Sequence, residues 1–187
     1  MMENNALSLE KLQSEMNEIG RIARSAAGKL SVVSAEDKVK CLNYMADCIL
    51  EDMKNILSAN RLDMAYGREH NLSSAMLDRL MLDEKRVIAV AEALRVVAAQ
   101  QDPVGRIISS AERPNGIKID KLSVPIGVIG IIYESRPNVT VDAAGICLKA
   151  GNAVILRGGS EAFNSSQAFA ASMARAAAKF GLQGVVQ

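Results

Sequence analysis

Hydrophobic residues recur at intervals of three and four along the first half of the chain, which is the spacing of amphipathic helices. Ser34 and Asp37 form a capping-box-like helix start, and Asp83 caps a later helix. The Asp-Pro-Val-Gly segment at 102–105 ends this helical part. The pattern predicts helices over residues 7–30, 34–68, 76–80 and 83–98.

The pattern changes to short β-type runs after residue 105. Residues 106–111 and 117–122 flank an Arg-Pro-Asn-Gly segment, and Asn-Gly is a strong hairpin signal. Polar residues alternate along the second run, so we expect an exposed ribbon. It is either a plain surface hairpin or an arm that pairs with another subunit, and the pattern leaves both open.

The last third of the chain predicts a unit of alternating strands and helices. Its first strand is apolar without alternation, which is typical of a strand buried on both faces of a parallel sheet. The fold class is therefore α/β, with right-handed crossovers. The predicted elements are a strand at 127–133, a helix at 139–149, a buried strand at 153–156, a helix at 161–180 and the opening of a third strand at 184–187.

Composition excludes several classes of partner. The 187 residues carry a formal net charge of +1, which gives no reason to expect nucleic acid or an acidic membrane as partner. No stretch of uncharged apolar residues is long enough to span a bilayer. The first ten residues carry Glu3 and Glu10 and no apolar run, so they are no secretory signal, and we expect a cytoplasmic protein.

Three cysteines are present, without the spacing of a paired metal site. Cys41 and Cys48 stack on one face of a predicted helix, and Cys147 lies in an apolar helix segment. His70, the single histidine, is in another segment. We interpret the cysteines as buried structural thiols, typical of a reducing cytoplasm, and expect no metal site.

The candidate chemistry lies where the two predicted parallel strands end. Ligands of open parallel sheets bind beyond the carboxyl ends of the strands, and the helices that follow offer N–H groups suited to an anion. The first end is the elbow Tyr133, Glu134, Ser135, Arg136, Pro137 and Asn138. The second is the turn Arg157, Gly158, Gly159, Ser160 and Glu161.

The second turn has two readings that spacing alone leaves equal. In one, Gly158 and Gly159 let the backbone approach a ligand, Arg157 binds phosphate, and Glu161 accepts a hydrogen bond from a ribose hydroxyl. In the other, the segment is a plain strand-to-helix turn with Ser160 as the helix N-cap. The GxGxxG and GxxxxGK[ST] patterns are absent.

Four further motifs carry a resemblance. They are Ala-Met-Leu-Asp-Arg-Leu at 75–80, Asp-Pro-Val-Gly at 102–105, Tyr-Glu-Ser-Arg-Pro-Asn-Val-Thr-Val-Asp at 133–142 and Gly-Asn-Ala-Val-Ile-Leu-Arg-Gly-Gly at 151–159. In this order they resemble the N-terminal portion of the gamma-glutamyl phosphate reductase family, also called glutamate-5-semialdehyde dehydrogenases, of the aldehyde dehydrogenase superfamily.

The resemblance implies a reaction and a domain plan. The family reduces gamma-glutamyl phosphate with NADPH to glutamate-5-semialdehyde and phosphate, in proline biosynthesis. The plan assigns residues 1–104 to the helical part of the cofactor domain. It assigns 105–123 to an oligomerisation hairpin, which implies a homo-oligomer, and 124–187 to a partial nucleotide-binding unit.

The resemblance also implies roles for the strand-end residues. Arg157 lies where relatives place a basic residue near the adenosine ribose, which suits the 2′-phosphate of NADPH, and Glu161 is the candidate for the ribose. Ser135 or Asn138 is a candidate to hold an oxyanion, and Arg136 to meet the acyl phosphate or a carboxylate. The implied cofactor-binding set is Tyr133, Glu134, Arg157, Gly158, Gly159, Ser160 and Glu161.

The resemblance further implies that the nucleophilic cysteine belongs to a catalytic domain beyond Gln187. We therefore expect no catalytic residue in this chain and no turnover by the chain alone, unless a missing carboxyl-terminal part is supplied. An interrupted gene and a split gene both fit this expectation. The alternatives are a non-catalytic dinucleotide-binding module and a helical interaction protein.

Overall fold

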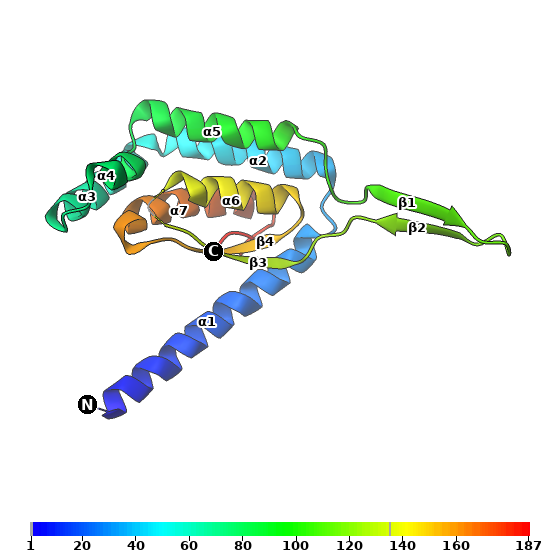
Figure 1. Ribbon diagram of the computed structural model, residues 1–187, viewed down its shortest axis with the longest axis horizontal. Helices are drawn as coiled ribbons and strands as arrows, with labels where there is room; N and C mark the ends of the chain where they lie inside the picture. Colours follow the sequence, from blue (N-terminus) through cyan, green and yellow to red (C-terminus); the bar gives the residue numbers. More distant parts are fainter. Residues whose placement is uncertain (1, 135) are drawn as a thin grey trace.

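The computed structural model describes residues 2–134 and 136–187, with side chains from Leu9 onward (Figure 1). Its helices are α1 (Met2–Leu30), α2 (Ala35–Glu51), α3 (Met53–Glu69), α4 (Ser74–Leu80), α5 (Glu84–Ala99), α6 (Asn138–Lys149) and α7 (Phe163–Lys179), with a short 3-10 helix η1 (Ser160–Ala162). Its strands are β1 (Ile107–Glu112), β2 (Lys118–Leu122), β3 (Val128–Ile132) and β4 (Ala153–Arg157). The predicted α/β class is confirmed.

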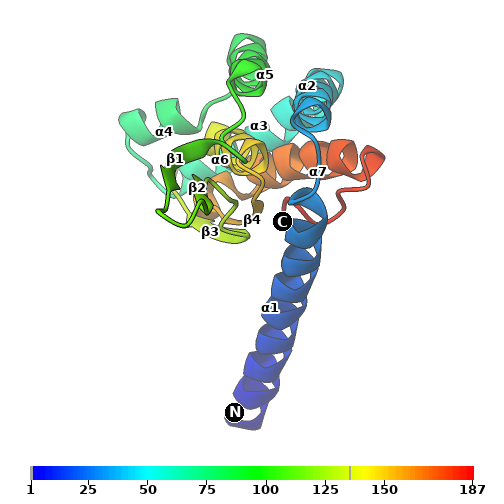
Figure 2. The ribbon, with the colours of Figure 1, turned by 90° about the vertical axis from the view of Figure 1, so that its right-hand side faces the viewer.

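The elements stack in layers around β4. Helices α2 and α5 form one outer layer, α6 and α7 lie between them and the strands, and α1 crosses the other face of the strands (Figure 1). Ala23 and Ala27 of α1 pack on Ala153, because small side chains let the helix approach the strand closely. Figure 2 shows the rest of α1 running away from the body, and Leu12 and Met16 of its apolar stripe are exposed.

The parallel sheet has β4 at its centre. Strand β3 pairs with β4 along its whole length. On the other side, Val186 forms a parallel bridge with Val154, and the Leu156 N–H donates to the Gln187 carbonyl at 2.6 Å. The predicted opening of a third strand is confirmed.

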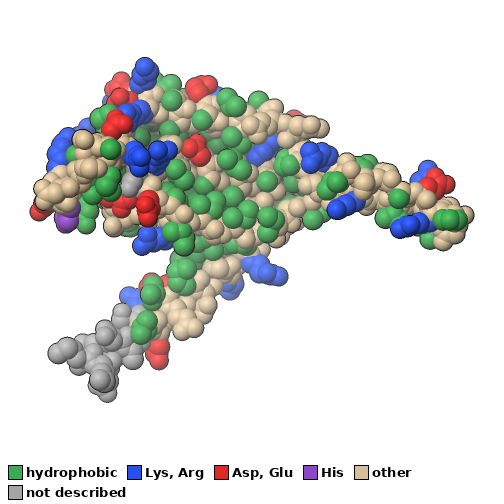
Figure 3. Space-filling model, in the orientation of Figure 1, with side chains coloured by type: hydrophobic (Ala, Val, Ile, Leu, Met, Phe, Trp, Pro, Cys, Tyr) green, Lys and Arg blue, Asp and Glu red, His purple; other side chains and the backbone are tan. Residues whose placement is uncertain are grey.

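The prediction that the first strand is buried on both faces is wrong. Ile126, just before β3, is 82% exposed, and Ile132 at its end is 81% exposed. Both covering helices, α1 and α6, centre on β4, where Ala153 and Val154 are fully buried. Figure 3 shows hydrophobic side chains gathered over the middle of the face where Figure 1 draws β3 and α6.

The predicted single helix over residues 34–68 is also wrong, because Asp52 divides it into α2 and α3. The Asp52 carboxylate accepts a hydrogen bond from the Ser172 hydroxyl of α7 at 2.6 Å. It also pairs with Arg175 at 2.9 Å. These contacts join the break to α7, along which α3 packs. The predicted caps at Ser34 and Asp83 are confirmed.

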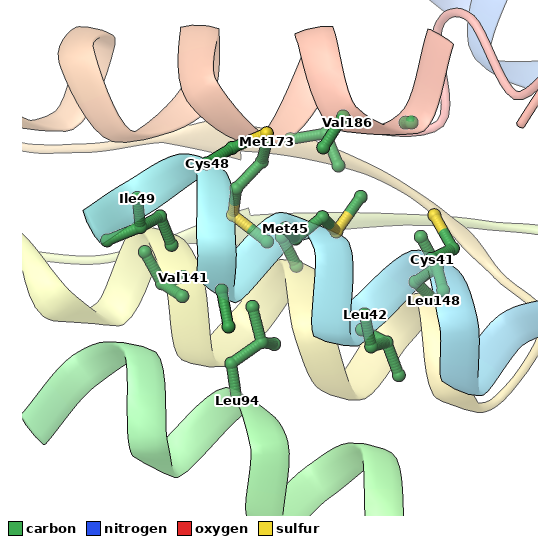
Figure 4. Close-up of a cluster of buried hydrophobic side chains, with 14 of the residues drawn as sticks. Cys41, Leu42, Met45, Cys48, Ile49, Leu94, Val141, Leu148, Met173 and Val186 are labelled. Carbon is green, nitrogen blue, oxygen red and sulfur yellow. The ribbon is translucent and has the colours of Figure 1, made fainter. Parts of the chain in front are cut away.

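The hydrophobic core lies between α2, α5, α6 and α7 (Figure 4). Helix α2 is its centre: Leu42, Met45 and Ile49 are fully buried, with Cys41 and Cys48 on the same face. Aliphatic and sulfur-containing side chains fill the space that aromatic residues take in other cores. Phe169 of α7 is a fully buried aromatic side chain in this cluster.

The hairpin projects from the body, as Figure 1 shows. Strands β1 and β2 pair in antiparallel fashion, and the turn closes with the Arg113 N–H donating to the Ile117 carbonyl at 2.9 Å. Every residue of both strands is exposed, so the predicted exposed ribbon is confirmed. Its exposed hydrophobic side chains are Ile107, Ile108, Ile117, Ile119 and Leu122.

A buried charge cluster anchors the root of the hairpin. Lys38, only 2% exposed, lies with its Nζ 2.6 Å from Asp102 Oδ2 and donates to the Lys149 carbonyl. Lys149 Nζ donates to the Ala98 carbonyl at 2.8 Å, and burial lowers its pKa. Burial opposes the Asp102 carboxylate, but the hydrogen bonds from Lys38 and the Val104 N–H outweigh it and lower the Asp102 pKa.

Candidate functional site

The two strand ends that the sequence singles out lie side by side. Tyr133 follows β3, Arg157 ends β4, and the Tyr133 N–H donates to the Arg157 carbonyl at 3.1 Å. The turn from Gly158 to Glu161 continues from Arg157 into η1. The parallel pairing of β3 and β4 therefore brings the elbow and the glycine turn to one edge of the sheet.

A side chain at either glycine of the turn would crowd a neighbouring side chain. A Cβ on Gly158 would lie 3.2 Å from the Tyr133 hydroxyl and 3.4 Å from Ser166 Oγ. A Cβ on Gly159 would overlap the Glu161 side chain, 2.6 Å from its Cδ. The Glu161 carboxylate thus lies directly over the turn, on the surface that Gly159 leaves open.

A small cavity of about 60 Å³ opens between the glycine turn and α7. The Tyr133 hydroxyl, at its wall, lies 2.7 Å from Thr140 Oγ1. The Ser166 hydroxyl is buried there and has no hydrogen-bond partner in the described chain. Phe163, 60% exposed, stands at the same cavity. An unpartnered buried hydroxyl beside an exposed aromatic ring is suited to a ligand that reaches into this cavity.

Ser166, Phe163 and Thr140 lie outside the set of site residues predicted from the sequence. A signal for the α7 residues exists: Phe163, Ser166, Gln167 and Ala170 recur at helical spacing and all line this cavity. Because this face begins directly after the glycine turn, helical periodicity alone was enough to place it at the strand ends.

The start of α7 differs from both readings of the turn. Ser160 is not the N-cap, because it lies inside η1, which Gly159 precedes as cap. The Asp63 carboxylate of α3 receives the N–H groups of Asn164 at 3.0 Å and Ser165 at 2.7 Å. The Asp63 carboxylate therefore already occupies these two donors of α7.

Arg157 is an available cation at the strand ends. Its side chain is exposed and makes no hydrogen bond or ion pair with the described residues. Glu134 and Arg136, on the elbow, are exposed as well. With the Asn164 and Ser165 N–H groups occupied, the Arg157 guanidinium is one group at this edge that can hold a phosphate.

The elbow is only partly placed. The Asn138 amide donates to Asp142 Oδ2 at 3.1 Å, which engages the group that the sequence analysis considers for an oxyanion. Ser135, the other oxyanion candidate, lies outside the described residues. The structure therefore brings Tyr133 and the glycine turn together. The Asn138 side chain instead bonds Asp142, one turn further along α6.

The cysteines confirm the prediction of buried thiols. Cys41, Cys48 and Cys147 are all free and buried. Burial raises the pKa of Cys41 to about 12 and also raises that of Cys147. A thiol needs a lowered pKa to act as a nucleophile near neutral pH, so neither of these two is activated.

The described residues contain no cluster of histidine, cysteine or carboxylate side chains able to hold a metal ion. Across the same part of the chain, no helix is long and apolar enough to cross a membrane.

Gamma-glutamyl phosphate reductases are among the curated proteins that match this chain. The chain is 53% identical over 165 residues to a gamma-glutamyl phosphate reductase of Clostridium novyi, matching 88% of this chain and 40% of that protein. It is 53% identical over 153 residues to one of Brucella suis, matching 82% of the chain and 36% of the relative. The chain thus spans about two fifths of the length of these relatives. No protein-family model matches it.

Solved structures agree. A gamma-glutamyl phosphate reductase of Thermotoga maritima superposes with a TM-score of 0.89 at 38% identity, covering 92% of this chain and 42% of that one. The Saccharomyces cerevisiae enzyme gives 0.85 at 30% identity, covering 91% and 45%. A probable aldehyde dehydrogenase of Listeria monocytogenes, at 15% identity and a TM-score of 0.67, covering 92% and 36%, shows the shared fold. The chain is therefore homologous to about two fifths of a gamma-glutamyl phosphate reductase and has the aldehyde dehydrogenase fold.

Proposed function

We propose that this chain is the cofactor-binding portion of an NADPH-dependent reductase that converts gamma-glutamyl phosphate to glutamate-5-semialdehyde and phosphate, in proline biosynthesis. The named relatives support the reaction. Residues 1–104 form the helical part of the cofactor domain, residues 105–123 the oligomerisation hairpin, and residues 124–187 the partial nucleotide-binding unit.

The observation that carries the proposal is Arg157, which lies exposed at the meeting point of two parallel strand ends and has no side-chain partner among the described residues. Its guanidinium suits the 2′-phosphate that distinguishes NADPH from NADH. Glu161, over Gly159, accepts from a ribose hydroxyl, and the buried Ser166 hydroxyl offers one further hydrogen bond. Tyr133 and Glu134 complete this side of the cofactor site, with Gly158, Gly159 and Ser160 as the turn.

The cofactor supplies hydride when it is bound. The residues of this chain hold its adenosine end and orient it against the sheet edge. Arg136, exposed on the elbow, meets the acyl phosphate or a carboxylate of the substrate, while Asn138 and Ser135 are the oxyanion candidates. Because all three cysteines are buried, we propose that turnover needs the nucleophile of the part of the relatives that this chain does not match.

The hairpin is the proposed contact with a second copy of the chain. Both of its strands expose hydrophobic side chains at a distance from the body, and exposed strand edges pair readily with other chains. A homo-oligomer formed through β1 and β2 would cover these side chains.

The test is a titration of the purified chain with NADPH and with NADH, in which the nucleotide fluorescence reports the dissociation constant. We expect tighter NADPH binding, and we expect Arg157→Ala to weaken NADPH about tenfold while leaving NADH unchanged. Arg157→Lys keeps a point charge and should keep part of the preference. Arg68→Ala removes an exposed arginine from α3 and is the matched control. Equal affinity for both nucleotides, or equal losses in the Arg157 and Arg68 variants, would contradict the proposal.

The chain alone should not oxidise NADPH in the presence of freshly made gamma-glutamyl phosphate. Oxidation by the chain alone would contradict the assignment of the nucleophile to the unmatched part of the relatives. Nucleotide binding that is never accompanied by activity, even when the carboxyl-terminal part of a relative is added, would favour a non-catalytic binding module instead.

A further inference from the structure

A second, larger pocket lies where the connection between α4 and α5 meets the first turns of α6, and Asn138 of the elbow lines it. We call it the α5–α6 pocket. Its volume is about 270 Å³, and Asn138 and Asp142 of α6 face it from one side. Arg79 and Arg86 line it as well, and its apolar wall includes Met81 and Val90. This volume is just below the usual range for drug-sized ligands, so the pocket suits a small metabolite.

The two arginines of the pocket differ in their bonding. Arg86 is held by the structure: its Nη2 lies 2.7 Å from Asp78 Oδ1, and its Nη1 donates to the Met81 carbonyl at 3.0 Å. Arg79, also at the pocket, is exposed and makes no hydrogen bond or ion pair with the described residues. Arg79 is therefore the guanidinium that remains available to a ligand.

Asp142 supplies the opposite charge. Its Oδ2 accepts the hydrogen bond from Asn138, and its other oxygen has no partner in the described chain. Burial raises the pKa of this carboxyl, and the Asn138 hydrogen bond only partly opposes the rise. A cation next to Asp142 would relieve the cost of burying the carboxylate.

The combination of charges discriminates between ligand classes. A simple anion attracted by Arg79 meets the Asp142 carboxylate in the same pocket, and a simple cation attracted by Asp142 meets Arg79. A ligand that carries both a carboxylate and an ammonium group satisfies both residues at once. The apolar wall of Met81 and Val90 suits an aliphatic stem between that head group and the elbow.

We infer that the α5–α6 pocket is a subsite for the head group of an α-amino acid, in which Arg79 binds the α-carboxylate and Asp142 binds the α-ammonium group. Asn138 links this subsite to the elbow, because the same residue begins α6 and holds Asp142. The inference rests on the proposed function for its substrate, a glutamyl compound, and makes Arg79 and Asp142 specificity-determining residues.

The test uses three probes that share one methyl ester chain. L-glutamate 5-methyl ester carries both charged groups, monomethyl glutarate lacks the ammonium group, and methyl 4-aminobutyrate lacks the carboxylate. Each is titrated into the isotope-labelled full chain and followed by amide NMR shifts. We expect saturable shifts at Arg79, Asn138 and Asp142 with the amino acid ester, and about tenfold weaker binding of either deletion probe.

Variants assign each ligand group to a residue. The Arg79→Ala variant should bind methyl 4-aminobutyrate, which lacks the carboxylate, as tightly as the amino acid ester. The Asp142→Asn variant should bind monomethyl glutarate, which lacks the ammonium group, as tightly as the amino acid ester. Arg79→Lys should retain part of the affinity. Lys85→Ala, which removes an exposed charge from the same end of α5 outside the pocket, is the control and should bind like the wild type.

Two results would overturn the subsite: monomethyl glutarate binding as tightly as the amino acid ester to the wild-type chain, or an ester that binds nowhere or shifts only residues outside the pocket. Neither result touches the nucleotide titration of the Arg157 variants, which uses no amino acid probe. A preference for NADPH without ester binding would therefore remove this inference and leave the proposed function standing.

Discussion

Asp63 Oδ2 accepts two hydrogen bonds from Ser165, one from its backbone N–H at 2.7 Å and one from its hydroxyl at 2.5 Å, although 102 positions separate the two residues. The other oxygen accepts from the backbone and side chain of Asn164. Asp63 is 1% exposed, so this is an N-cap supplied by a distant helix. It fixes the start of α7, and with it the end of the glycine turn.

Asp63→Ala should lower the free energy of unfolding by about 2–4 kcal/mol, because it leaves buried N–H donors of α7 without an acceptor. Urea unfolding followed by circular dichroism measures this change. Asp47→Ala is the matched control, since Asp47 is half exposed and pairs with Arg95 at the surface. Similar losses in both variants would show that the cap contributes no more than a surface ion pair.

Asp102→Asn should remove a pH-dependent part of the stability. The folded state lowers the Asp102 pKa, so its carboxylate stabilises the fold above the ordinary pKa, and this is lost as the pH falls through the lower folded value. The wild type should therefore lose stability below about pH 4, while the variant changes less there.

At pH 7 the same variant should be less stable by about 3 kcal/mol, because Lys38 stays buried without its ion partner. Unfolding midpoints measured from pH 7 to pH 2 test both statements. Glu36→Gln, which removes only a surface partner of Lys40, should leave the profile unchanged. Parallel profiles for the wild type and Asp102→Asn would contradict the role of the cluster.

Two helical glycines should respond to alanine with opposite signs. A Cβ on Gly145 of α6 would overlap the buried Leu94 side chain of α5, so Gly145→Ala should cost about 1–3 kcal/mol by overpacking. A Cβ on Gly28 of α1 meets nothing within 4 Å, so Gly28→Ala should stabilise by about 0.5–1 kcal/mol. Thermal unfolding of the two variants measures these changes. Stabilisation by both substitutions would show that the Leu94 side chain moves aside at little cost and would contradict the predicted overpacking.

Gly159→Ala should weaken NADPH binding without unfolding the chain. The new methyl group must displace the Glu161 carboxylate, which is the flexible end of its side chain, so the stability should change little. The proposed ribose contact would be lost, and affinity should fall about tenfold. Gly130→Ala in β3 meets nothing within 4 Å and serves as the control. Unchanged affinity in Gly159→Ala would argue against Glu161 as a nucleotide ligand.

Charges on the hairpin should separate the subunits. If β1 and β2 contact a second copy, the double substitution Ile108→Lys and Ile119→Lys should shift the sedimentation coefficient from oligomer to monomer. Far-ultraviolet circular dichroism should stay the same, since both residues are exposed. A wild-type chain that sediments as a monomer would contradict the proposed contact.

Local patterns predicted most elements, and long-range contacts account for the misses. Helix spacing, caps and the Asn-Gly turn depend on neighbours in sequence, and these predictions are confirmed. The break at Asp52 depends on Ser172 and Arg175, which are more than a hundred positions away. The exposure of β3 depends on helices that centre on β4, a fact of packing that an apolar run cannot show.

The candidate site divides in the same way. Parallel strands deliver their ends to one edge, so the meeting of Tyr133 and Arg157 followed from topology. The role of Asp63 as the cap of α7 could not be predicted, because a single aspartate inside a predicted helix does not indicate which distant residue it contacts. The α5–α6 pocket likewise joins residues of two separate motifs, 75–80 and 133–142, whose closeness in space depends on the packing of α4, α5 and α6.

The contact of α1 with β4 has a consequence for synthesis on the ribosome. Ala23 and Ala27 find their packing partner in Ala153, which follows Ala27 by 126 positions. At the usual elongation rate that delay is roughly 6–25 s. Helix α1 therefore leaves the ribosome well before its packing partner exists, and its alanine face stays open to chaperones until β4 has been made.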